Sequence, residues 1–118
     1  MNDQNLIKIE KLINSELSSK IFDSEIKFEE LLIKTSISEI TNVIKFLKLY
    51  NRFKFKQLID IAAIDYPNEE KRFELVYLLL SIENNTRVKI SIKLELNDKI
   101  PSIVKIFPSA NWMEREIF

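Results

Sequence analysis

The chain has 118 residues, of which 46% are hydrophobic and 31% are charged, a balance typical of one globular domain rather than of a disordered chain. Its 18 cationic side chains match its 18 anionic ones, so the net charge gives no reason to expect a polyanion such as DNA. Because the sequence contains no Cys, His or Gly, it excludes thiolate and iron–sulfur chemistry, histidine proton shuttles and Gly-rich phosphate loops, which argues against a self-contained enzyme.

The N-terminal stretch predicts an amphipathic helix over about residues 3–18. Leu6, Ile9, Ile13 and Leu17 recur at helical spacing, and charged residues lie between them. The sequence lacks the basic start and apolar run of a signal peptide. Its longest nearly apolar run, residues 76–82, is far shorter than the roughly 20 residues that a membrane span needs. We therefore expect a soluble, cytoplasmic chain.

Residues 21–33 are rich in Ile and Phe and predict one or two strands, and residues 36–51 predict a helix. Ser36 and Glu39 fit a capping box, in which both side chains satisfy exposed backbone N–H groups. The apolar residues that would line one face of this helix are Ile37, Ile40, Ile44 and Leu47, with Val43 beside them. The cations that would suit the helix dipole near its end are Lys45, Lys48 and Arg52.

The middle of the chain predicts strands. Residues 57–66 form a mostly apolar run that ends at Pro67. Residues 73–83 are apolar on both faces, as in a central strand. Asn84 and Asn85 suit a turn because Asn tolerates positive φ, and strict alternation follows them. Residues 73–96 therefore predict a hairpin with one half-solvated strand.

Pro101 is predicted to open a short helix over residues 102–107 that ends near Pro108, and a further helix is expected to begin around Ala110 or Asn111. The order of elements predicts a single α+β domain over residues 1–118. Its architecture would be a two-layer sandwich, with a mixed or antiparallel sheet and helices mainly on one face.

Two candidate sites have ordinary structural alternatives. Asp60 and Asp65 could perform acid–base chemistry if they shared a site, but their opposite parity sends them to opposite faces of a regular strand. We therefore expect Asp65 to support the turn before Pro67 and Asp60 to meet a neighbouring polar group. Residues 48–56, KLYNRFKFK, could stack bases and hold phosphates. The zero net charge favours instead a helix end whose aromatic side chains pack inward.

The last eight residues, NWMEREIF, predict a helix that is apolar on several sides. Met113 and Ile117 share one face of it, and Arg115 could reach a carboxylate bidentately. The pattern fits a terminal helix docked on the sheet and a surface for a partner equally well.

Three ordered segments resemble the thirty-kilodalton subunit family of proton-pumping NADH–quinone oxidoreductase, respiratory complex I. They are FKQLIDIAAIDYP at 55–67, RFELVYLLLSIENNTRVKISIKL at 72–94 and PSIVKIFPSANWMEREIF at 101–118. The resemblance covers roughly residues 20–118. A lone Glu-Arg-Glu would be a weak signal, but the ordered set is specific.

The resemblance implies a non-catalytic scaffold subunit within an oxidoreductase complex, without catalytic residues of its own. Such a subunit braces the cluster- and quinone-binding subunits of the peripheral arm and so supports electron transfer from NADH to quinone. The complex carries FMN, Fe–S clusters and quinone, whereas this chain would bind no cofactor or metal. Its partners would be other peripheral-arm subunits and not nucleic acid. It would reach the cytoplasmic side of the inner membrane only through the complex.

The resemblance also suggests a subunit interface at Trp112, Glu114, Arg115 and Glu116. Trp112 would be the apolar anchor, and the charged residues would form ion pairs that set register. In the family the sequence continues beyond this signature, so we expect this chain to lack the family's C-terminal arm.

Other functions remain open from sequence alone. The module is also similar to the equivalent subunit of membrane-bound hydrogenase-type complexes. A nucleic-acid-binding α+β domain that uses residues 45–56 is a further alternative, and an autonomous enzyme has the least support.

Overall fold

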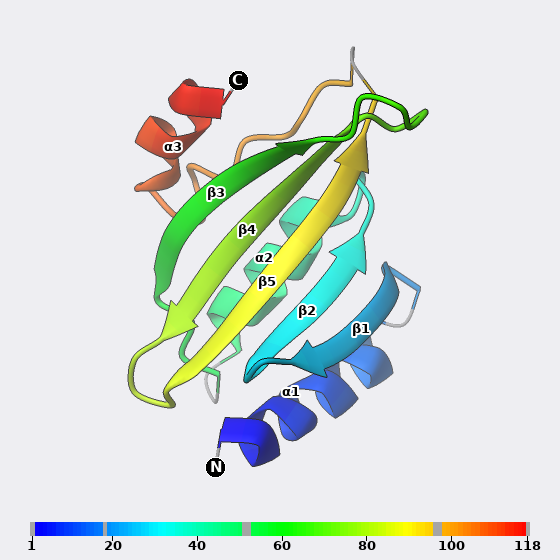
Figure 1. Cartoon of the computed structure of the whole chain (residues 1–118). Helices are drawn as coiled ribbons and strands as arrows, with labels where there is room; N and C mark the ends of the chain where they lie inside the picture. Colours follow the sequence, from blue (N-terminus) through cyan, green and yellow to red (C-terminus); the bar gives the residue numbers. More distant parts are fainter. Residues whose placement is uncertain (1, 18, 51–52, 96–97, 118) are drawn as a thin grey trace.

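The computed structural model describes residues 2–17, 19–50, 53–95 and 98–117 (Figure 1). The predicted N-terminal helix, the hairpin and the last helix are confirmed, and the one or two strands expected after the first helix are two. In chain order the elements are α1 (Asn2–Glu16), β1 (Ile21–Lys27), β2 (Glu30–Thr35), α2 (Ile40–Leu49), β3 (Gln57–Asp65), β4 (Phe73–Ser81), β5 (Thr86–Leu94) and α3 (Ala110–Ile117).

The strands form one five-stranded sheet in the order β1-β2-β5-β4-β3. β2 and β5 run parallel, and every other neighbouring pair is antiparallel. The sheet is therefore mixed, and with its helices it makes the predicted α+β fold. β4 lies between β5 and β3, which confirms it as an inner strand.

One face of the sheet carries the core. Along β4 and β5 every second side chain is buried, and the register places Ile33, Ile90 and Tyr77 in one row across three strands. Buried residues of the helices, among them Ile13 of α1 and Ile44 of α2, belong to the same cluster. Figure 1 shows α2 crossing behind the sheet and α1 beside β1 and β2. Burial of such side chains stabilises the domain by roughly 1.5–3 kcal/mol each.

Helix α2 begins at Ile40, later than the sequence predicts, and the predicted capping box is wrong. The N-cap residue is Glu39, and no side chain caps the helix. The Ser36 and Ser38 hydroxyl groups lie 2.9 Å apart and bond to each other, and Glu39 Oε1 accepts a hydrogen bond from Asn42 Nδ2 at 3.0 Å. Both halves of the expected box are therefore engaged elsewhere.

The predicted buried face of α2 is confirmed. Ile40, Val43, Ile44 and Leu47 are buried, and Ile37 packs against them from the preceding turn. The helix ends at Leu49, and Arg52 lies outside the described residues.

After Pro101 the chain forms a turn and not the predicted short helix. The backbone N–H groups of Ile106 and Phe107 both donate to the carbonyl oxygen of Ile103, at 2.9 and 2.8 Å. The helical pattern stops there because Pro108 disfavours helical geometry in the residue before it. Ile103 and Phe107 are buried, so their spacing fixes this turn to the core.

Candidate subunit interface

A buried glutamate fixes helix α3 to the domain. Glu114 is 7% exposed, and its Oε2 accepts a hydrogen bond from the backbone N–H of Ile103 at 2.9 Å. Its Oε1 accepts one from the Ser102 hydroxyl at 2.6 Å. A carboxylate that satisfies two donors in a buried place makes strong, charge-assisted hydrogen bonds. Glu114 therefore holds α3 against the turn that follows Pro101.

Of the four predicted interface residues, one is buried in its own domain and three are exposed. Glu114 faces its own domain, whereas Trp112, Arg115 and Glu116 are exposed. Trp112 is 70% exposed, and Arg115 and Glu116 lie three and four residues after it, on one side of the helix. Arg115 and Glu116 form no ion pair within the described part of the chain. Helix α3 thus presents an aromatic and two charged groups on an anchored backbone.

Tyr77 shows on which side of the sheet α3 lies. Its side chain is fully buried in the core, and its hydroxyl has no hydrogen-bond partner among the described residues. Burial raises the pKa of Tyr77, and the negative charge of Glu114 raises it further. Tyr77 belongs to one buried cluster with Ile13 of α1, Ile44 of α2 and Ala110 of α3, so α3, which contacts β3, begins on the same side of the sheet as α1 and α2.

The opposite face of the sheet, here called the open face, has no helix over it in the described residues (Figure 1). The half-buried side chains on the β4 part of this face, the apolar ridge, are Val76, Leu78 and Leu80. The cations on the neighbouring β5 part, the basic ridge, are Arg87, Lys89 and Lys93. Sequence reasoning did not identify this surface. Its signal was the run of apolar residues on both faces of β4, which indicated only a central strand.

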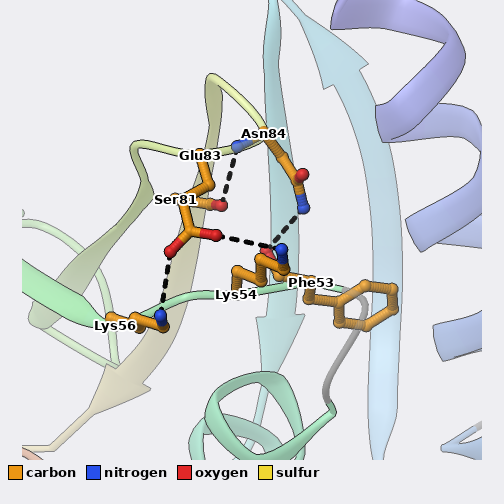
Figure 2. A network of polar contacts seen from close by, with 6 residues as sticks. All are labelled: Phe53, Lys54, Lys56, Ser81, Glu83 and Asn84. Atoms are coloured by element: carbon orange, nitrogen blue, oxygen red, sulfur yellow. Dashed lines mark hydrogen bonds and ion pairs between the residues drawn. The ribbon is translucent and has the colours of Figure 1, made fainter.

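The basic and aromatic segment before β3 has its predicted structural role. Phe53 and Phe55 are buried, at 5% and 0% exposure. Lys56 and Lys54 form ion pairs with Glu83 in the β4–β5 turn, with Nζ–O distances of 2.8 and 2.9 Å (Figure 2). The hydrogen bonds from Lys56 and Lys54 lower the pKa of Glu83 to about 2. These two aromatic rings are therefore not available for base stacking, and both cations have partners.

The same network holds the hairpin turn in place. Figure 2 shows Asn84 reaching from the turn, where its Nδ2 donates to the carbonyl oxygen of Phe53 at 3.1 Å. The Asn84 backbone N–H donates to the Ser81 hydroxyl at 3.3 Å. Asn85 has a φ of 52°, which confirms the predicted positive-φ turn.

The two strand aspartates do not form a shared site. Asp60 faces Leu78 on the open face, and its Oδ1 accepts a hydrogen bond from the backbone N–H of Ile61. Asp65 is on the other side of the strand and makes two hydrogen bonds with Arg72, at 2.7 and 3.0 Å. Over the described ranges, no cluster of three His, Cys, Asp or Glu residues could bind a metal ion. No helix of those ranges has the length and apolarity to span a bilayer.

Comparisons with known proteins place the chain in one group of respiratory proteins. Its sequence is 38% identical over 106 residues to the NADH-quinone oxidoreductase subunit designated C in Chelativorans sp. (strain BNC1), covering 90% of this chain and 53% of that protein. It is 35% identical over 116 residues to the protein of the same name from Parvibaculum lavamentivorans, with 98% and 58% covered. For the Wolbachia sp. subsp. Brugia malayi protein of that name the identity is 44% over 88 residues, with 75% and 46% covered. The chain thus spans about half the length of these curated relatives.

The fold has a match among solved structures. A chain from "Structure of the membrane-bound sulfane sulfur reductase (MBS), an archaeal respiratory membrane complex" superposes with a TM-score of 0.75. The identity is 23%, and the match covers 93% of this chain and 65% of that one, so this likeness shows the fold alone. The profile of the family described as "Respiratory-chain NADH dehydrogenase, 30 Kd subunit" matches residues 33–118, which are most of the sequence. The chain therefore belongs to the 30 Kd subunit family of respiratory-chain NADH dehydrogenase.

Proposed function

We propose that this chain acts as a non-catalytic scaffold in the peripheral arm of a proton-pumping NADH–quinone oxidoreductase. It braces the subunits that carry the terminal iron–sulfur cluster and frame the quinone cavity, and so supports electron transfer from NADH to quinone. Membership of the family and the names of the relatives favour this complex. The chain is attached on the cytoplasmic side of the membrane through its partner subunits.

The observation that carries the scaffold role is the surface of α3. Trp and Arg are the residue types that most often dominate the energetics of protein interfaces. Here Trp112 is 70% exposed and lies one helical turn from Arg115. The hydrogen bond between Glu114 and the backbone N–H of Ile103 holds this helix to the domain. An anchored helix loses little conformational freedom on binding, which lowers the entropic cost of association.

In this proposal FMN, the iron–sulfur clusters and quinone are bound by other subunits. The side chains available here support that division of labour, because the sequence has no Cys or His to ligate a cluster or a metal. The chain would contribute shape and positioning to the reaction and no reacting group.

The test is to express Trp112→Ala and Arg115→Ala variants together with the other subunits of the complex. Each variant should reduce the amount of chain that comigrates with the assembled complex by about tenfold, the effect of losing one interface anchor. NADH–quinone activity of the membranes should fall in parallel. Lys8→Ala, an exposed change on α1, is the control and should alter neither quantity. Normal assembly of both α3 variants would refute the role of this surface.

The equivalent subunit of a membrane-bound hydrogenase-type complex is a weaker candidate. The solved structure with the same fold comes from a different respiratory membrane complex, but its identity to this chain is below that of the NADH-quinone oxidoreductase relatives. The electron donor separates the two. Complexes that contain this chain should oxidise NADH, and oxidation of ferredoxin without NADH activity would favour the hydrogenase type.

A further inference from the structure

We propose that the open face of the sheet is a second docking surface, which receives an acidic amphipathic helix from a neighbouring subunit. The inference rests on the proposed scaffold function but concerns a different part of the molecule. Helix α3 begins at Ala110 in the buried core cluster, whereas this surface lies on the other side of the sheet. The chain would then be held between two partner contacts.

The first argument is the exposed state of the sheet. β2 and β5 form a parallel pair within a mixed sheet, and sheets built only of parallel strands are covered on both faces. In the described residues this pair is covered on one face only. The apolar ridge lies beside it, and its residues Val76, Leu78 and Leu80 stay half-buried without any helix above them. A layer of helix is the usual cover for such a surface.

The second argument is a hollow at one corner of the open face. A shallow cavity of about 590 Å³ lies there, lined by Phe22, Lys34, Lys71 and Lys93 among others. Phe22 is 74% exposed and projects from the edge strand β1. An exposed aromatic side chain at the rim of a cavity is an expected anchor for a partner side chain.

The third argument is charge, which identifies the occupant. Lys34 and Lys71 are exposed and form no ion pair within the described residues. Lys93 forms an exposed pair with Glu69 at 3.4 Å, which contributes little, and its ammonium lies over the Tyr66 ring, 4.8 Å from the centroid. The hollow therefore offers ammonium groups to an incoming partner.

The two carboxylates that line the hollow are already engaged within the domain. Glu74 accepts a hydrogen bond from the Tyr66 hydroxyl at 3.0 Å. Asp98 accepts one from the backbone N–H of Glu95 at 2.7 Å. The three lysines of the hollow outnumber these two carboxylates, and Lys34 and Lys71 form no ion pair within the described residues, so an acidic partner suits this surface better than a basic one.

A helix with acidic residues along one side of its apolar stripe matches this surface. Its apolar side chains would pack on the apolar ridge, and its carboxylates would reach Lys34 and Lys71 across the hollow. Complementary charges at such a rim steer association and fix orientation more than they add affinity. The apolar ridge supplies the burial, and the lysines select the partner and its direction.

The experiment places the photo-crosslinker p-benzoylphenylalanine at position 22 of the full chain and irradiates the assembled complex. Because Phe22 is exposed, one aromatic ring replaces another there without disturbing the core. The expected product links position 22 to a peptide of another subunit of the same complex. That peptide should have apolar residues at helical spacing and several Asp or Glu residues. Crosslinks to lipid or nucleic acid, to a peptide without acidic residues, or to nothing would overturn the proposal.

Charge reversal tests the selectivity. Lys34→Glu with Lys71→Glu should lower the yield of this crosslink about tenfold, because two attractive contacts become repulsive. Lys8→Glu with Lys11→Glu, two exposed lysines of α1, is the matched control and should leave the yield unchanged. An unchanged yield in the first pair contradicts the proposal. If the wild-type chain does not comigrate with the complex at all, the scaffold function fails too, and if it comigrates without the crosslink, only the open-face proposal fails.

Discussion

Glu114 and Glu83 both accept hydrogen bonds, but Glu114 is buried and Glu83 is exposed, so the two residues should affect stability in different ways. Glu114 is buried, and its removal would leave the backbone N–H of Ile103 without a partner inside the domain. Glu114→Ala should therefore lower the free energy of unfolding by about 1–3 kcal/mol, the cost of an unsatisfied buried donor. Chemical denaturation measures this change. Glu114→Gln keeps an acceptor oxygen and should cost less, and the exposed Glu116→Ala should stay within about 0.5 kcal/mol of wild type.

Glu83 is exposed, so its effect should appear in the pH dependence of stability. Lys56 and Lys54 lower its pKa in the folded state from 4.5 to about 2. A lowered folded pKa stabilises the domain above the unfolded value, and this contribution is lost as the pH falls from about 4.5 towards 2. Glu83→Gln should thus lower the urea midpoint at neutral pH, with a difference from wild type that vanishes by about pH 2.

The control for Glu83 is a double-mutant cycle. In a chain that carries Lys54→Met and Lys56→Met, the Glu83→Gln exchange should change the urea midpoint little at any pH, because its partners are gone. An equal effect with and without the lysines would show that the ion pairs do not cause the lowered pKa.

At the scale of elements, the sequence predicted each helix and strand whose side chains alternate or recur regularly. Two local predictions were wrong: the capping box at the start of α2 and the short helix after Pro101. Ser36 was expected to cap α2, but its hydroxyl bonds the Ser38 hydroxyl at 2.9 Å. Ile103 and Phe107 have the spacing of a helix but close only a single turn, because Pro108 follows them. The spacing of apolar residues shows neither which hydrogen bonds a serine side chain makes nor where a proline ends a helical turn.

The β4–β5 turn gives a prediction at this scale. Asn85 has a positive φ, which costs a β-branched residue roughly 1–2 kcal/mol and costs Gly nothing. Asn85→Val should therefore lower the melting temperature clearly, whereas Asn85→Gly should stay near wild type. Thermal unfolding followed by circular dichroism compares the two. Equal melting temperatures would mean that the turn adopts another conformation.

At the scale of the whole molecule, sequence patterns predicted which side chains are buried but not which surfaces need a partner. The alternation of apolar and polar residues along β5 predicts one polar face. It does not show whether that face contacts water or another subunit. The sequence likewise did not predict which of the four interface residues point outward. Trp112, Arg115 and Glu116 are exposed, but the inward direction of Glu114 depends on the turn after Pro101, whose shape the sequence did not reveal.

Two docking surfaces on opposite sides of one sheet should act independently. The α3 surface and the open face share no residues and are separated by the sheet. Substitutions in the two surfaces should therefore have additive effects on the free energy of binding, and their fold-changes in comigration should multiply. If Trp112→Ala and the Lys34→Glu, Lys71→Glu pair each lower comigration with the complex about tenfold, the triple variant should lower it about a hundredfold. Quantitative immunoblots of native gels measure this product. A triple variant no worse than Trp112→Ala alone would mean that both surfaces serve a single contact, with α3 binding first.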